Sequence, residues 1–150
     1  MRVQRFHTYQ LAFANLAVSA GSEVAGGSAA DSFLVETAYD FWLLKMQAFI
    51  STFATGQGIV TNTLPLLTVL MQDGSSQQQL SNEAVPIAAQ FGTGEIPYIL
   101  PQPHIIGGGA TFNATVTNLS TTAYSVRLLF SGVHVAHGQA PARRGRIRGR

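Results

Sequence analysis

The sequence contains no cysteine, and this absence excludes disulfide bonds, thiolate metal sites and cysteine nucleophiles. Long apolar runs are missing as well, because none reaches the roughly 18–20 residues needed to cross a bilayer. The apolar stretch 41–53, for example, is interrupted by Lys45 and Gln47. Residues 6–18 follow two arginines but lack the continuous apolar region of a signal peptide, so we expect them to belong to the mature protein.

Charged residues are scarce too, at 11% of the chain against about a quarter in typical domains. Apolar residues reach 46%, and much of the remainder is Ser, Thr, Gln, Asn and Gly. A lone soluble domain normally carries more surface charge. The composition therefore favours a protein whose surface is largely covered by neighbouring molecules, and we expect it to form homo-oligomers.

The few charges are unevenly placed. Residues 1–142 hold four basic and seven acidic residues, a net charge of about −3, whereas the last eight residues hold five arginines, a charge of +5. These candidate partner-binding residues are Arg143, Arg144, Arg146, Arg148 and Arg150. A basic arm on a mildly acidic body indicates an electrostatic tether. Its partner would be an acidic protein surface or, less favoured, nucleic-acid phosphates; a solvated appendage without a partner is the third alternative.

The pattern along the chain is typical of β-strands. Residues 111–117 alternate strictly, with Phe112, Ala114 and Val116 on one side and Thr or Asn on the other. Residues 124–131 alternate in the same way, and we expect these two segments to pair as a hairpin. The alternation predicts that two sheets close over Phe112, Val116, Val126, Leu128 and Phe130.

Other segments predict further strands less cleanly, at 6–18, 32–37 and 64–72. Residues 41–51 are apolar on both faces, which fits a central strand or a helix, and the aromatic content favours the strand. Prolines make 83–91 an edge or broken strand and 96–106 an irregular extended path. We therefore predict an all-β protein: an antiparallel β-sandwich, most readily a jelly roll, of about eight strands over residues 1–138, followed by an Arg/Gly-rich tail at 139–150.

Signals for catalysis are weak. His134 and His137 are three apart at the end of a predicted strand, where they would face opposite sides, so we expect no metal there. Asp31, Glu36 and Asp40 are expected to be solvated acids at strand ends. The glycines at 107–109 lack the Lys-Ser/Thr ending of a phosphate loop and predict a turn. No catalytic or cofactor-binding residue is predicted, and we expect a protein without enzymatic activity.

Two further sets of residues leave binding functions open. The triplets at 113–115 and 118–120 match the N-glycosylation pattern, which also arises by chance in Thr-rich strands. The aromatic residues are spread over many strands, as a packed core requires. A sugar-binding platform around Tyr98 or Trp42 is the alternative for the aromatic residues.

In the C-terminal half, a Pro-rich extended segment (96–101) and a Gly turn (107–109) are followed by a strand ending in Asn (111–118) and a last strand with Phe-Ser-Gly (126–133). An apolar strand after an acidic turn (37–44) precedes them. This pattern resembles small β-sandwich virion proteins of tailed bacteriophages. It covers about residues 30–135 and excludes the arginine tail. Since that group is structural, the resemblance implies no catalytic or cofactor-binding residues.

The resemblance implies a non-enzymatic virion protein, most readily a capsid cement or decoration protein that bridges major capsid subunits. Its partners would be the major capsid protein or other virion proteins, and its location the virion. A neck, fibre or tail component is the alternative within the particle. A carbohydrate-binding β-sandwich module for host recognition is the alternative from another class.

Overall fold

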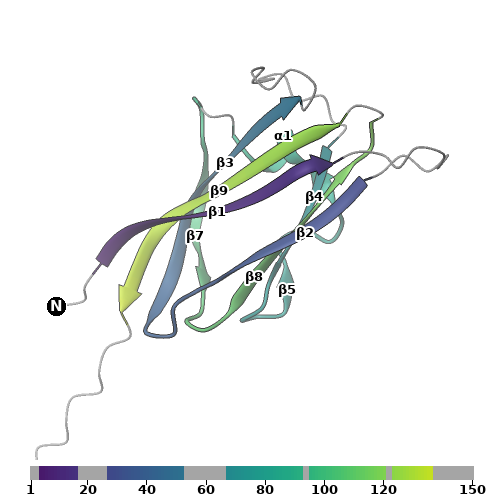
Figure 1. Ribbon diagram of the computed structural model, residues 1–150. Helices are drawn as coiled ribbons and strands as arrows, with labels where there is room; N and C mark the ends of the chain where they lie inside the picture. The colour runs from purple at the N-terminus through teal and green to yellow at the C-terminus, as the bar shows by residue number, and fades with distance from the viewer. Residues whose placement is uncertain (1–3, 17–26, 53–66, 93–94, 121–122, 137–150) are drawn as a thin grey trace, which may run out of the picture.

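The computed structural model describes residues 4–16, 27–52, 67–92, 95–120 and 123–136. Most of them lie in antiparallel strands, which form two sheets packed face to face (Figure 1). The elements in chain order are β1 (Gln4–Leu16), β2 (Gly27–Leu34), β3 (Tyr39–Thr52), β4 (Leu67–Asp73), β5 (Gln78–Gln79), β6 (Val85–Pro86), α1 (Ile87–Gln90), β7 (Tyr98–Ile106), β8 (Thr111–Asn118) and β9 (Tyr124–Ala136). The predicted all-β sandwich is confirmed.

The strand order is that of a jelly roll. Sheet A has the order β1-β9-β3-β7, and sheet B has the order β2-β8-β4-β5, with β6 also paired to β4. Long strands that follow one another in the chain lie in opposite sheets, so the chain passes repeatedly from one sheet to the other. This connectivity corresponds to the two Greek-key motifs of a jelly roll. β1 begins and β9 ends at the same end of the molecule, where Gln4 lies opposite Val135 (Figure 1).

The expected hairpin between 111–117 and 124–131 is wrong. β8 pairs with β2 and β4, whereas β9 pairs with β1 and β3. Asn118 redirects the chain at the end of β8: its buried side-chain amide donates to the Leu16 carbonyl, 2.8 Å away, and its Oδ1 accepts from the Ser120 N–H at 2.9 Å. Alternation reveals which face of a strand is buried but not which strand lies beside it.

The predicted core is confirmed. Phe112, Val116, Val126, Leu128 and Phe130 are all fully buried between the sheets. Four aromatic side chains meet at the centre: Phe33 and Phe112 come from sheet B, and Phe41 and Phe130 come from sheet A. The ring contacts between the two sheets have centroid distances of 5.3–6.2 Å. Because both sheets contribute to this cluster, it fixes their relative position.

Residues 41–51 form the predicted strand and not a helix. β3 lies inside sheet A, hydrogen-bonded to β9 on one side and to β7 on the other. Its inner face contributes Phe41 and Leu43 to the core, and Trp42 on its outer face is half-buried. β2 spans Gly27–Leu34, earlier than the expected strand at 32–37. Residues 17–18, 64–66 and 137–150 of the predicted segments lie outside the described residues.

The proline-containing segments behave largely as predicted. β7 is an edge strand with an interrupted register: residues 100–103 lie between the partners of Leu43 and Lys45, opposite Leu44 alone. Pro86 ends β6 after two residues, and the four-residue helix α1 follows, which the sequence did not indicate. The glycines at 107–109 form the expected turn, with Gly109 at a φ of +79°.

Candidate interaction surface

The outer face of sheet A carries a row of apolar side chains that crosses all four strands. The register places Phe6 of β1 opposite Val133 of β9, Val133 opposite Trp42 of β3, and Trp42 opposite Ile105 of β7. Phe6 is 66% exposed and Ile105 is 50% exposed, while Val133 and Trp42 are half-buried. We call these four residues the apolar row.

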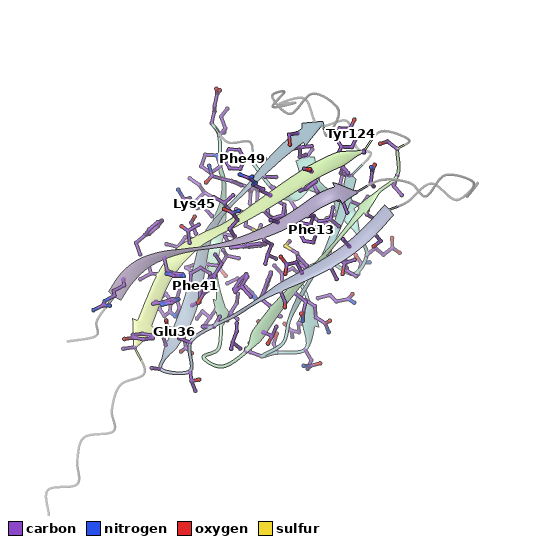
Figure 2. All side chains as sticks on the ribbon, viewed as in Figure 1. Phe13, Glu36, Phe41, Lys45, Phe49 and Tyr124 are labelled. Carbon is purple, nitrogen blue, oxygen red and sulfur yellow. The ribbon has the colours of Figure 1, made fainter. Side chains whose placement is uncertain are left out.

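Neighbouring side chains extend the apolar row and add a cation. Ile99 is 69% exposed and lies beside Lys45 in the next register row. The Lys45 ammonium lies 5.9 Å from the centroid of the Phe6 ring, close enough for a cation–π interaction. Figure 2 shows Phe13 and Phe41 between the two sheets, with Lys45 and Phe49 on the outer side of sheet A.

The rest of this outer face is mostly polar and neutral. Thr8 and Ser131 share a hydrogen bond of 3.0 Å between their hydroxyl oxygens, and the next rows bring Gln10, Leu129 and Gln47 together. Further along the face is a shallow hollow of about 490 Å³, lined by Gln10, Phe49, Ile50, Ser51, Ser125, Arg127 and Leu129. The face thus changes from apolar at the end where β1 begins to polar at the other end.

The outer face of sheet B differs, since short neutral polar side chains prevail on it. β8 presents four of them, Thr111, Asn113, Thr115 and Thr117, and the Thr117 hydroxyl donates to the Ser28 hydroxyl of β2 at 3.2 Å. One large apolar side chain, Leu34 at the end of β2, is 63% exposed. The two broad faces of the sandwich are therefore not equivalent, and the exposed apolar row belongs to sheet A.

The two glycosylation-type triplets have different surroundings. Asn113 is exposed on the outer face of sheet B. Asn118 is fully buried, and its amide nitrogen is engaged by the Leu16 carbonyl. Asn118 therefore cannot be glycosylated in the folded protein, whereas Asn113 is accessible.

His134 of β9 is a buried histidine. It is 6% exposed, and its Nε2 lies 3.0 Å from the Tyr9 hydroxyl. The His7 ring stacks on it with centroids 4.5 Å apart, and the Tyr39 ring stacks at 5.5 Å. Burial and then the nearby His7 lower the pKa of His134, although Glu36 opposes them. The imidazole is therefore held neutral inside an aromatic cluster.

Tyr9 in the same cluster is shifted the other way. Burial, followed by the charge of Glu36, raises the pKa of its phenol above 10.0. Tyr9 also stacks on Phe33 of sheet B with centroids 4.1 Å apart. Because His134 is buried among these rings and its Nε2 is engaged by the Tyr9 hydroxyl, we assign the cluster a packing role.

A second polar cluster joins the two sheets at one end. Asp73, at the end of β4, is fully buried and lies 3.0 Å from Nε2 of His104 on β7. The Ser75 hydroxyl and backbone N–H both donate to Asp73 Oδ1, at 2.6 and 2.8 Å, and the Ser76 hydroxyl donates to Oδ2 at 3.2 Å. Burial alone would raise the pKa of Asp73, but the bonds from Ser75 and His104 outweigh it and lower the pKa.

This Asp73 cluster contains Ser, His and Asp but not the geometry of a nucleophilic triad. In a triad the histidine lies between the other two, whereas here Asp73 is the central group and both serines donate to it. The serine hydroxyls have no base to activate them. The cluster closes the β4–β5 turn and ties it to β7.

A cleft of about 480 Å³ adjoins this cluster along the edge strand β7. It is lined by Met46, Leu80, Gln90, Tyr98, Leu100, Pro101, Gln102, Pro103 and His104. Tyr98 is 41% exposed, and the Oε1 atom of Gln90 is buried with no hydrogen-bond partner among the described residues. The cleft therefore combines an accessible aromatic ring with amide groups.

The acids singled out in the sequence do not form a catalytic pair. Asp31 Oδ2 accepts from the Ala12 N–H of β1 at 3.4 Å, and Asp40 Oδ1 accepts from the Gly108 N–H at 3.1 Å. Glu36 is exposed in the connection between β2 and β3. Each acid therefore has separate surroundings. Asp31 lies in the middle of β2 and not at a strand end as predicted, and both Asp31 and Asp40 accept hydrogen bonds from backbone N–H groups.

The predicted partner-binding arginines, Arg143, Arg144, Arg146, Arg148 and Arg150, lie outside the described residues, as does His137. Sequence reasoning missed the apolar row because its members come from four strands. In the sequence, these side chains appear only as single apolar residues at outward positions of separate strands. The strand order and register are needed to show that they lie side by side.

Within the described ranges, no group of three His, Asp or Glu side chains is placed to hold a metal ion. No helix in that same part of the chain is long and apolar enough to span a membrane. Comparison with family models, curated proteins and solved structures yields no match to this chain.

Proposed function

We propose that this chain is a non-enzymatic structural protein of a bacteriophage virion. The apolar row is the observation that carries the proposal, because it places exposed Phe6 and Ile105 on a broad sheet face together with half-buried Trp42 and Val133. An exposed apolar patch that is rimmed by polar groups marks a protein interaction site. The low charge of the chain also favours a molecule enclosed by neighbours.

The jelly-roll topology supports the same proposal more weakly. Viral capsid proteins share this strand order, but so do lectins and other proteins, and a fold alone does not define a function. We infer that the protein acts as capsid cement or decoration, bridging major capsid subunits through the outer face of sheet A. Many identical copies on a symmetric shell would make weak single contacts add up.

The experiment is a decoration assay on particles that lack the protein. Purified wild type, Ile105→Lys and Leu34→Lys are added, and occupancy is measured by sedimentation and image reconstruction. Ile105 lies in the apolar row and Leu34 on sheet B, at 50% and 63% exposure, so the two variants add the same charge at comparably exposed sites on opposite faces. We expect Ile105→Lys to lose occupancy and Leu34→Lys to retain it.

Two results would contradict the proposal. If wild-type protein does not associate with any particle component, the proposed virion role is wrong. If Ile105→Lys and Leu34→Lys lose occupancy equally, the apolar row is not the specific contact surface.

A carbohydrate-binding module is the second candidate, and the cleft beside Tyr98 is the observation that favours it. An accessible aromatic ring with Gln90 and Gln102 nearby is a combination suited to stacking on a sugar and bonding its hydroxyls. Titration with a glycan panel tests this candidate. Binding that is abolished by Tyr98→Ala and retained by Ile105→Lys would favour host recognition over the cement role.

A further inference from the structure

β1 is the outermost strand of sheet A on one side, and β2 of sheet B lies beside part of its free edge. The strand runs from Gln4 to Leu16, and among the described residues its hydrogen-bonded neighbour in the order β1-β9-β3-β7 is β9. Its register with β9 is regular from Gln4 to Phe13. An edge of this kind presents backbone donors and acceptors that another strand can bind.

The direction of these backbone groups follows from one hydrogen bond. The Ala12 N–H donates to Asp31 Oδ2 of β2 and so faces away from β9. In an antiparallel strand the N–H and C=O of one residue face the same side, and alternate residues face opposite sides. Phe6, Thr8 and Gln10 therefore direct their N–H and C=O groups outward, while Asp31 covers the edge at Ala12.

Two of the three other sheet edges are protected in ways that β1 is not, while β2, the remaining edge of sheet B, carries the charged Asp31 within its eight residues. β7, the opposite edge of sheet A, contains Pro101 and Pro103 and an interrupted register. β5 on sheet B has only two residues. Prolines, irregularities and short length are the devices by which natural sheets prevent edge pairing. β1 contains no proline over thirteen residues, and Arg5 is its only formal charge.

We propose that two copies of this chain pair through β1, antiparallel about a two-fold axis at Thr8, joining their A sheets into one continuous sheet. The facing residues would be Thr8 with Thr8 of the second copy, and Phe6 with Gln10 in both directions. Each of these three pairs can exchange two backbone hydrogen bonds, because all three residues face outward. The ladder would end at Ala12, where Asp31 already occupies the N–H.

Charge complementarity favours a second copy in this register. A two-fold axis at Thr8 places Arg5 of one copy opposite Leu11 of the other, one residue from Ala12 and the Asp31 bound to it. Arg5 and Leu11 belong to the face of β1 that is directed toward sheet B, which is also the side from which Asp31 approaches. Each Arg5 would therefore lie near the Asp31 of the other copy, and this ion pair would form twice.

The pairing would also extend the interaction surface of the proposed function, although it does not depend on that function. Phe6 begins the apolar row at the β1 edge, so the rows of two copies would lie on one face of the joined sheet. Seven residues of paired edge are about 24 Å long and bury on the order of 1,000 Å² in total, the lower limit for a specific interface. We therefore expect a concentration-dependent dimer of modest affinity.

The test is sedimentation equilibrium of the isolated protein with Gln10→Pro and its control Gln10→Ala. Proline removes the outward N–H without affecting the bonds to β9, whereas alanine keeps the N–H. We expect wild type and Gln10→Ala to dimerise alike, and Gln10→Pro to raise the dissociation constant by roughly tenfold or more, since the loss occurs twice by symmetry.

Two further measurements keep the inference testable if Gln10→Pro does not fold. In wild-type protein, hydrogen exchange of the Phe6, Thr8 and Gln10 amides should slow as concentration rises. Arg5→Asp and Asp31→Arg should each weaken the dimer, and the double variant should restore part of the affinity. A monomer at every concentration, a dimer whose three amides exchange at unchanged rates, or equal effects of Gln10→Pro and Gln10→Ala would each overturn the proposal. Because the measurement uses isolated protein, its result is independent of particle binding.

Discussion

Phe130 is the core residue whose removal should be most costly. Its side chain is fully buried and contacts three other rings, Phe33 at 5.5 Å, Phe112 at 5.3 Å and Phe91 at 5.7 Å. Truncation of a buried Phe to Ala costs about 3–5 kcal/mol from lost transfer free energy and the remaining cavity. Aromatic pairs add about 0.5–1.5 kcal/mol beyond area burial, so we expect Phe130→Ala near the upper end of that range.

The matched control is Phe6→Ala, which makes the same chemical deletion at a side chain that is 66% exposed. Urea unfolding followed by circular dichroism gives the free energy of unfolding for both variants. We expect Phe6→Ala to cost less than about 1 kcal/mol, because its ring is mostly in solvent. Equal losses in the two variants would refute the assignment of Phe130 to the core. If Phe130→Ala is unfolded outright, the milder Phe130→Leu should still be less stable than Phe6→Leu.

Three further predictions concern a glycine, a histidine and the tail. Gly132→Ala should destabilise the fold strongly, since a Cβ there would collide with the Trp42 carbonyl oxygen. Gly107→Ala, whose Cβ would lie 3.3 Å from the Ser75 Cβ, should lower the melting temperature much less, because it requires a displacement of only a few tenths of an ångström. Because the pKa of His134 is lowered from 6.5 in the folded protein, the unfolded chain binds this proton first as pH falls. The free energy of unfolding should therefore decrease as the pH falls below about 6.5, and His134→Gln should reduce this dependence, as measured by thermal melting between pH 7 and pH 5. Deletion of residues 143–150 should leave the circular dichroism spectrum unchanged but weaken particle binding and reduce its salt sensitivity, because fewer screened ion pairs remain; unchanged occupancy and salt dependence would contradict the tether.

The sequence by itself determined the class of fold and the phase of its clearest strands. Strict alternation at 111–117 and 124–131 assigns Phe112 and Phe130 to the buried face, because successive side chains of a strand point to opposite sides. Prolines in 96–106 predicted an irregular extended path, since proline cannot donate to a sheet ladder, and the structure places this segment as the edge strand β7. These are local properties of the backbone, and local sequence is sufficient to reveal them.

Only the tertiary structure decided which strands are neighbours. The expected pairing of 111–117 with 124–131 failed because the chain crosses from sheet B to sheet A between them, and the energy that selects this crossing comes from distant residues such as Leu16 and Phe33. The apolar row depends on the same information, since Phe6, Val133, Trp42 and Ile105 are far apart in the chain and become neighbours through register alone. The free edge of β1 likewise follows from the strand order, in which β9 is its hydrogen-bonded neighbour among the described residues.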